Sequence, residues 1–412
     1  MTKKEKNIYL SYIGTTKTAF LKARYSLDGQ PEVLSLSARL SDGFERGVVK
    51  DLYQASETVT QEINDIVGAE HESILPCKLV VSNAYVRNYT FHSSIYFQDR
   101  PHALTLKDVR DAIAQTRSVA TIPLDQVIIQ AVPQAFLVND LDGIQNPIGL
   151  EASRLGVTLR LLTLDGYVYS NLLRVFEMCD VEVTDIIPGV LASSHAVLTS
   201  EEKQNGVILV DIGGNVTQFA CYQSNVLVQT CSIPIGADHM TEVLAKELNI
   251  SKLDAQKVKE AYGSAVSRRE FREELIPIRD TKGEKEFTIK RTEFEAHLDT
   301  GMKHFFSEMN GQIKTLQKQF APLNQVVFTG GGSKLEGLLD VVKEAVSPIA
   351  RIGIAKGIIG PEALITNPAF SSALGGISYS SRVSDYGRLV ASPSNWFSRA
   401  VETTRNWVFE YF

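Results

Sequence analysis

The residues best suited to chemistry in this chain are the glycine-rich turns that follow three short apolar strands. The turns contain Gly14, Thr15, Thr16 and Lys17 after strand 8–12, Gly213, Gly214 and Asn215 after strand 207–211, and Gly330, Gly331, Gly332 and Ser333 after strand 326–329. Glycine lets the backbone approach a phosphate closely and point successive N–H groups at it. The first two strand–turn segments resemble each other, which indicates an internal repeat. The pattern therefore predicts one nucleotide held between two similar halves.

Two side chains could supply charge at these turns. Lys17 could place a positive charge on the phosphates, although a lysine on a hairpin can also be an ordinary surface residue. Asp211 could face a hydrated Mg²⁺, because magnesium at phosphates uses one or two carboxylates and several waters; the alternative is an aspartate that caps the turn. The third turn precedes a predicted helix at 335–346, whose N-terminal amides favour negative charge.

Composition excludes several classes of protein. The 412 residues are 44% hydrophobic and 22% charged, which is typical of a globular protein, and the length allows two or more domains. The net charge of −6 disfavours nucleic acid as the main partner. The four cysteines lack metal-ligand spacing, which favours buried thiols in a reducing compartment. No apolar stretch approaches the roughly 20 residues of a transmembrane helix, so we expect a cytoplasmic protein with peripheral membrane contact at most.

The pattern along the chain predicts an ordered series of domains. Residues 84–164 have a different sequence pattern from their surroundings, with a strand of alternating polar and apolar residues at 86–97 and a helix at 106–119. The pattern indicates a compact insert. Serine, glycine and proline at 378–394 indicate a polar linker. The expected units are a first half (1–83 and 165–195), the insert (84–164), a second half (196–377, with a smaller insert at about 250–320), the linker (378–394) and a terminal helix (395–412).

From residues 43–51, through 143–149 and 191–194, to its end, the chain resembles FtsA, the actin-like family of bacterial cell division. The likeness covers nearly the whole chain in the family's order. It implies an α/β, actin-like two-half ATPase fold with an FtsA-type inserted subdomain and a C-terminal amphipathic helix. The same superfamily includes sugar kinases and Hsp70. The resemblance also implies that Gln256 and Lys259 occupy the places of an acid and a lysine near the ribose and base.

The nucleotide site departs from the family pattern. The family expects an acid where this chain has Tyr12, a third glycine at Asn215, a threonine at Val216 and an acid at Gln218. Asp211 is then the only matched carboxylate that remains. A hydrolytic site needs groups that hold the metal and orient the attacking water. We therefore expect ATP and Mg²⁺ to bind weakly and ATP hydrolysis to be weak or lost, while Asn215, which tolerates left-handed backbone angles, keeps the turn open.

The last 18 residues carry a helical apolar face. At about 100° per residue, large apolar side chains share an arc of roughly 160°, and the members expected to contact the membrane are Trp396, Phe397, Val401, Trp407, Val408, Tyr411 and Phe412. Such a helix suits insertion at a bilayer interface. Two arginines balance two glutamates there, so insertion must rest on apolar burial. The alternative is a terminal helix that docks on its own core.

The resemblance implies a function. An FtsA-like chain would tether FtsZ, the tubulin-like division ring protein, to the inner face of the bacterial cytoplasmic membrane at the division site. It would form protofilaments or small oligomers with itself and recruit later division proteins through the 84–164 insert, with ATP as a mainly structural ligand. The alternatives are an actin-fold ATPase or kinase and a pilus-assembly actin homologue. Against a kinase, no carboxylate is evident as a base for a substrate hydroxyl.

Overall fold

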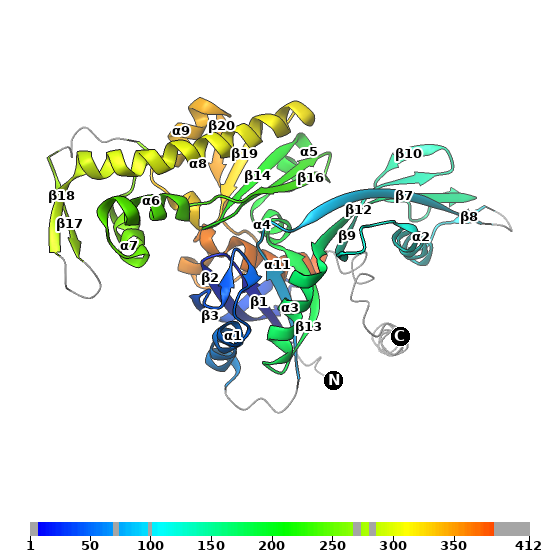
Figure 1. Ribbon diagram of the computed structural model, residues 1–412. Coiled ribbons are helices and arrows are strands. Elements are labelled where there is room, and N and C mark those ends of the chain that lie inside the picture. The colour runs from blue at the N-terminus through cyan, green and yellow to red at the C-terminus, as the bar shows by residue number, and fades with distance from the viewer. Residues whose placement is uncertain (1–6, 69–73, 98–100, 267–272, 280–285, 383–412) are drawn as a thin grey trace.

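The computed structural model describes residues 7–68, 74–97, 101–266, 273–279 and 286–382. Two five-stranded sheets form its centre, and an insert and a helical arm project on opposite sides (Figure 1). The terminal helix predicted at 395–412 lies outside the described residues. No helix in the described ranges is long and apolar enough to cross a membrane.

The two central sheets repeat one topology. Each begins with three antiparallel strands and continues with two parallel ones, so that β3-β2-β1-β6-β13 corresponds to β16-β15-β14-β19-β20. The first sheet contains β1 (Ile8–Ile13), β2 (Lys17–Tyr25), β3 (Pro31–Leu40), β6 (Leu75–Val81) and β13 (Val181–Pro188). The second contains β14 (Val207–Ile212), β15 (Thr217–Gln223), β16 (Val226–Ile233), β19 (Gln325–Thr329) and β20 (Ile349–Ile352). The predicted internal repeat is therefore confirmed.

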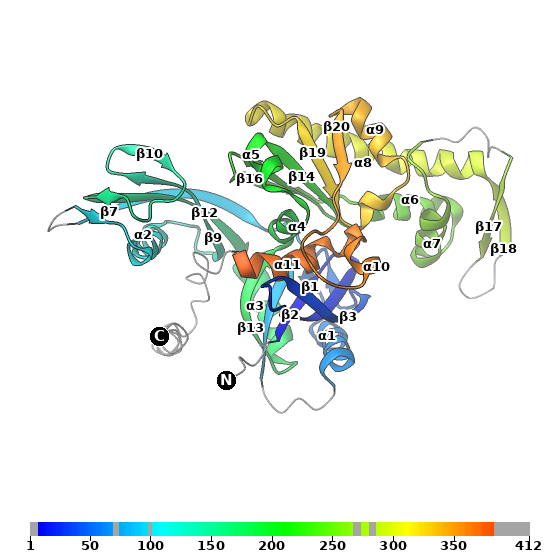
Figure 2. The same cartoon turned by 180° about the vertical axis from the view of Figure 1, so that it is seen from behind.

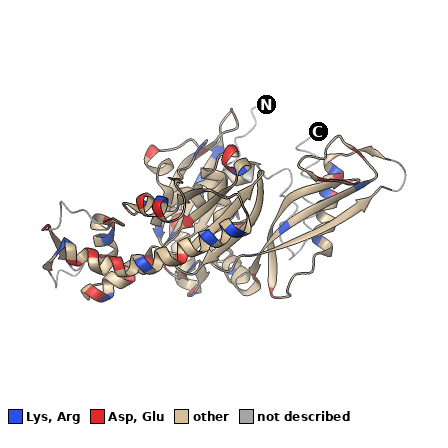
Figure 3. Cartoon of the chain, turned by 90° about the horizontal axis from the view of Figure 1, so that it is seen from above, with Lys and Arg blue, Asp and Glu red and all other residues tan. Residues whose placement is uncertain are grey.

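Helices cover these sheets because their apolar faces need a partner. Against the first sheet lie α1 (Leu52–Val67) and α3 (Gly166–Glu177), with the short strands β4 (Phe44–Glu45) and β5 (Val48–Val49) nearby. The second half carries α5 (Ser200–Asn205), α6 (Asp238–Leu248), α7 (Lys252–Tyr262), α8 (Arg291–Gln319), α9 (Leu338–Ala345), α10 (Glu362–Ile365), the hairpin β17 (Leu275–Arg279) and β18 (Glu286–Lys290), and the 3₁₀ turns η2 (Gly331–Lys334) and η3 (Pro368–Phe370). Acidic and basic residues are interspersed along the long α8 (Figure 3).

Two helices connect the halves. Helix α4 (Gly189–Val197) contacts β13 and β6 of the first sheet and β14 and β15 of the second, and α11 (Ser371–Arg382) packs on α4, β1 and β6. Figure 2 shows α11, in orange to red, running along the first sheet toward the insert. The boundary predicted for the linker at 378 is therefore wrong, because the helix continues through Arg382. The sequence had placed residues 371–377 in the second half, to which Ser371 and Ser372 hydrogen-bond through Thr329 and Asp211. The rest of α11 packs on the first sheet.

The insert has its own apolar core. Its sheet runs β10-β9-β12-β7, and α2 covers one face. Its elements are β7 (Arg87–Tyr96), β8 (His102–Ala103), α2 (Leu106–Val119), β9 (Gln126–Val138), β10 (Leu141–Ile144), β11 (Glu151–Ala152) and β12 (Arg154–Asp165). Thr105 and Asp108 form a reciprocal cap at the start of α2, which explains why this helix was predictable to the residue.

Candidate functional site

The first two glycine turns have the same backbone hydrogen bond. The amide of Gly14 donates to the carbonyl of Lys17, and the amide of Gly213 donates to the carbonyl of Val216, both at 3.0 Å. Each turn lies between the first two antiparallel strands of its half. The two turns predicted to clasp a ligand thus occupy equivalent places in the two sheets.

The two turns contact each other directly. The Thr15 hydroxyl oxygen accepts hydrogen bonds from the amides of Gly214 and Asn215, each at 3.1 Å. These are the amides that the sequence assigned to phosphate. In this structure the Thr15 side chain of the first half accepts their hydrogen bonds. A protein group therefore occupies the position that the sequence assigned to phosphate.

Close packing explains the glycines of the second turn. A Cβ on Gly214 would lie 2.3 Å from Cγ2 of Thr16, although Gly214 has no positive φ. A Cβ on Gly236 would lie 2.4 Å from the carbonyl oxygens of Gly213 and Gly214. Asn215 has no positive φ either, so the left-handed angles considered for it are not used.

The third turn requires glycine for two reasons. Gly330 has φ +84°, which favours glycine, and its Cβ would lie 2.4 Å from Oδ1 of Asp211. The Ser333 hydroxyl donates to the carbonyl of Gly330 at 2.7 Å and is buried. The helix predicted from 335 begins at Leu338 instead, because Gly337 directly before it has a left-handed backbone, with φ +73°. The start of α9 is therefore separated from the glycines.

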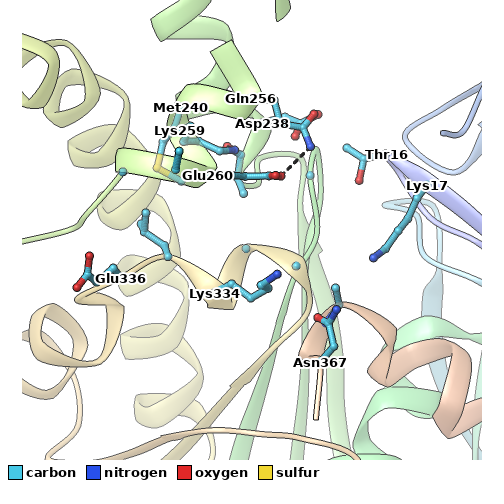
Figure 4. Close-up of a pocket in the computed structure, with 18 of the residues that line it drawn as sticks. Thr16, Lys17, Asp238, Met240, Gln256, Lys259, Glu260, Lys334, Glu336 and Asn367 are labelled. Carbon is cyan, nitrogen blue, oxygen red and sulfur yellow. Dashed lines mark hydrogen bonds between the residues drawn. The ribbon is translucent and has the colours of Figure 1, made fainter. Parts of the chain in front are cut away.

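A cavity of about 400 Å³ lies between the halves beside these turns (Figure 4). This volume is within the range of small-molecule sites, roughly 300–1,000 Å³. Seven predicted residues line it: Thr16, Lys17, Gly214, Gln256, Lys259, Gly331 and Gly332. A neighbouring space of about 40 Å³ adds Thr15, Asp211, Gly213 and Gly330. Gly14, Asn215 and Ser333 line neither space.

Lys17 is the most perturbed base of the pocket. Its ammonium lies 4.0 Å from the centre of the Phe370 ring. Burial, the largest cause, and the positive charge of Lys334 together lower its pKa to about 8, against the opposing effect of Glu260. A charge held in such a place favours an anionic partner.

The two residues expected near the ribose and base have partners within α6 and α7. Lys259 donates to the carbonyl of Ala237 at 2.9 Å and to the hydroxyl of Thr241 at 2.7 Å, and burial lowers its pKa. Gln256 donates to Glu260 at 2.9 Å. An ammonium has three donors, so Lys259 retains one for a ligand.

The surroundings of Asp211 do not fit a magnesium ion held by the protein. Its carboxylate accepts a hydrogen bond from the Ser372 hydroxyl at 2.7 Å. Burial raises its pKa, while Ser372 and Ser193 act in the opposite direction. Within the described ranges, no group of three or more His, Cys, Asp or Glu could hold a metal. The metal role of Asp211 stays a prediction without support from its neighbours.

The positions that depart from the family pattern are filled by neutral groups. Burial raises the pKa of Tyr12, and the Asp211 carboxylate raises it further, so the phenol stays protonated. Gln218 donates to the carbonyl of Asn83 at 3.0 Å, and Val216 is 2% exposed. The replaced acids therefore leave no charged ligand here.

Several pocket residues were not predicted. Lys334, Glu260, Asp238 and Asn367 line the cavity. Lys334 directly follows the third turn, and Asp238 begins α6 after Gly236, so their places beside glycine were the available signal. Asp238 accepts from Asn215 at 3.3 Å and lies 3.3 Å from the ammonium of Lys252.

Family comparisons cover both the insert and the second half. Residues 208–375 match the family described as "Cell division protein FtsA", and residues 83–163 match the "SHS2 domain inserted in FTSA". The second match begins and ends one residue before the predicted insert, 84–164.

Curated relatives extend the match along the chain. FtsA of Pseudomonas aeruginosa is 25% identical over 96% of both chains, and FtsA of Escherichia coli K12 is 24% identical over 94% of both. Among solved structures, a PilM–PilN type IV pilus biogenesis complex has a TM-score of 0.63 at 14% identity, covering 92% of this chain and 99% of the other. MreB5 of Spiroplasma citri bound to ADP has a TM-score of 0.53 at 14% identity, covering 92% and 97%. These structures show the fold alone, which is actin-like. With two family matches and relatives that span its length, the chain belongs to the FtsA family of cell-division proteins.

Proposed function

We propose that this protein tethers the FtsZ ring to the inner face of the cytoplasmic membrane at the division site. The observation that carries the proposal is the apolar arc of residues 395–412, at the end of a chain of a cell-division family. Self-association into protofilaments or small oligomers, and recruitment of later division proteins through the insert at 84–164, belong to the same proposal.

Sedimentation with lipid vesicles tests the tether. The full chain sediments with vesicles and carries FtsZ polymers down, whereas deletion of 395–412, or Trp396→Glu with Trp407→Glu, leaves both in the supernatant. The matched control is Thr403→Ser, which lies outside the apolar arc and should retain binding. Because the tail is charge-balanced, binding should persist at high salt. Loss of binding by about 0.3 M salt would show that electrostatic attraction dominates instead.

ATP is the second part of the proposal, as a ligand with a mainly structural role. The cavity between the halves and the lysines on its walls support binding, while Tyr12, Val216 and Gln218 disfavour hydrolysis. Calorimetry with ATP and a phosphate-release assay test the two statements separately. Release at kinase-like rates, about 1–100 per second, would contradict the structural role.

A further inference from the structure

Two ammonium groups from opposite halves face each other across the pocket. Lys17 begins β2 of the first half, and Lys334 ends η2 of the second. Figure 4 shows the two side chains pointing toward one another. They are close enough for the charge of Lys334 to lower the pKa of Lys17. Like charges placed together at a cavity need a compensating anion.

The ammonium groups of these two lysines have few ionic partners among the described residues. Among the described residues, neither Lys17 nor Lys334 forms an ion pair, although many lysines elsewhere do. The negative charge of Glu260 opposes the pKa shift of Lys17, and its carboxylate also accepts a hydrogen bond from the Gln256 amide at 2.9 Å. The aromatic ring of Phe370 is the contact recorded for the Lys17 ammonium. Three acids also line the cavity, Asp238, Glu260 and Glu336, and Glu260 is the one whose charge raises the pKa of Lys17. The two facing ammonium groups therefore outnumber the acid that acts on Lys17.

The groups that usually receive phosphate and metal are already engaged. The amides of Gly214 and Asn215 already donate hydrogen bonds to the Thr15 hydroxyl oxygen. Asp211 is buried against the hydroxyl of Ser372. A polyphosphate that enters the cavity meets the two ammonium groups, but no carboxylate cluster in the described ranges that could hold a cation for it.

We propose that the pocket binds a nucleoside polyphosphate without a divalent metal, and that Lys17 and Lys334 supply the positive charge that a metal ion would otherwise supply. The proposal rests on the nucleotide part of the proposed function. Lysine acts here as a compact point charge on a flexible stem. Lys259 adds one remaining donor on the opposite wall.

Calorimetric titration of the full chain with ATP tests this, with EDTA in one series and Mg²⁺ in the other. The affinity for ATP should agree within about threefold between the two series, because the two lysines, rather than Mg²⁺, are proposed to balance the charge of the phosphates. Lys334→Gln should weaken ATP binding in EDTA by about tenfold or more, since hydrogen bonds to charged groups contribute strongly. Lys334→Arg should restore most of it, and adenosine should bind wild type and Lys334→Gln equally.

Lys343→Gln is the matched control, because Lys343 is an exposed lysine on α9 outside the cavity. A thermal melt without ligand checks that each variant is folded. Binding of ATP in Mg²⁺ but not in EDTA would overturn the inference and leave the proposed nucleotide ligand intact. Equal behaviour of Lys334→Gln and Lys343→Gln would also overturn it. Failure of ATP and adenosine to bind in either series would overturn the nucleotide proposal itself.

Discussion

The two glycine turns share a backbone and differ in what their side chains do. Both close with a glycine amide that donates to a carbonyl three residues later. The first turn presents a hydroxyl and an ammonium, Thr15 and Lys17, whereas the second presents backbone amides that donate to the Thr15 hydroxyl oxygen. The duplicated frame therefore remains while the halves have become complementary to each other. Backbone geometry and ligand chemistry can thus change independently.

The largest effect on stability is expected at Gly236, which packs against the backbone of the second turn. Gly236→Ala would place a Cβ 2.4 Å from two backbone carbonyl oxygens. Neither carbonyl can move without displacing the turn, so the free energy of unfolding should fall by about 2–3 kcal/mol. Gly311→Ala is the control, because Gly311 lies in α8 with open space around it and alanine favours helix. Chemical denaturation measures both variants, and an unchanged Gly236→Ala would show that the second turn has room to shift.

Loss of the contact between the turns should have the next largest effect. Thr15→Val keeps the side-chain shape but removes the oxygen that accepts from Gly214 and Asn215. Two amides then lose their partner, and the free energy of unfolding should fall by about 2 kcal/mol. Thr16→Val, on the adjacent residue of the same turn, serves as the control in the same denaturation experiment. Equal stability of the two variants would mean that water replaces the Thr15 oxygen without loss.

The role of the Lys17 charge can be tested by measuring ATP affinity as a function of pH. Burial first, and then the charge of Lys334, lower the pKa of Lys17 from 10.5 to about 8, although Glu260 opposes the shift. Because the protonated ammonium is the form that attracts phosphate, ATP affinity in EDTA should fall as pH rises through about 8. Arginine stays charged throughout this range, so Lys17→Arg should give a flatter profile. Parallel profiles for the two proteins would place the titrating group elsewhere.

The smallest effect is expected at Asn215. Asn215→Gly would restore the family's third glycine and remove one long hydrogen bond, 3.3 Å, to Asp238. The amide that donates to Thr15 belongs to the backbone and is kept. The free energy of unfolding should change by no more than about 1 kcal/mol. A larger loss in thermal denaturation would assign the asparagine side chain a structural role that its contacts do not explain.

Local signals explain what the sequence could predict. The strand–glycine pattern located all three turns, and helical periodicity gave α2 its observed bounds. The contact of Thr15 with Gly214 joins residues 199 positions apart, and no spacing pattern encodes such a partner. Lys334 was missed because its significance comes from Lys17, which lies on the other half. The start of α9 was misplaced because Leu335 fits the apolar pattern of the helix, whereas Gly337, with φ +73°, breaks the helical backbone before Leu338.

Helix α11 was assigned incorrectly for a similar reason. Its residues follow the second half in sequence, but Ala373, Leu374 and Ile377 are buried in the core of the first. A Cβ on Gly375 would collide with the carbonyl of Ala192 on α4, so the two helices meet backbone to backbone. Sequence order suggested that α11 packs on the second half, whereas its buried apolar residues pack on the first.

The placement of α11 has a mechanical consequence. A pulling force on the chain beyond residue 382 is received first by this helix, which is packed on α4 and the first sheet. From there hydrogen bonds carry the load onward, among them the bond from Tyr379 to Gln130 of the insert at 2.9 Å and the bond from Ser372 to Asp211 beside the pocket. Because Asp211 belongs to β14, the second half receives part of that load directly, beside the pocket. Tension at the C-terminal end therefore strains the insert and the pocket floor before it strains the arm built from α7, β17 and β18.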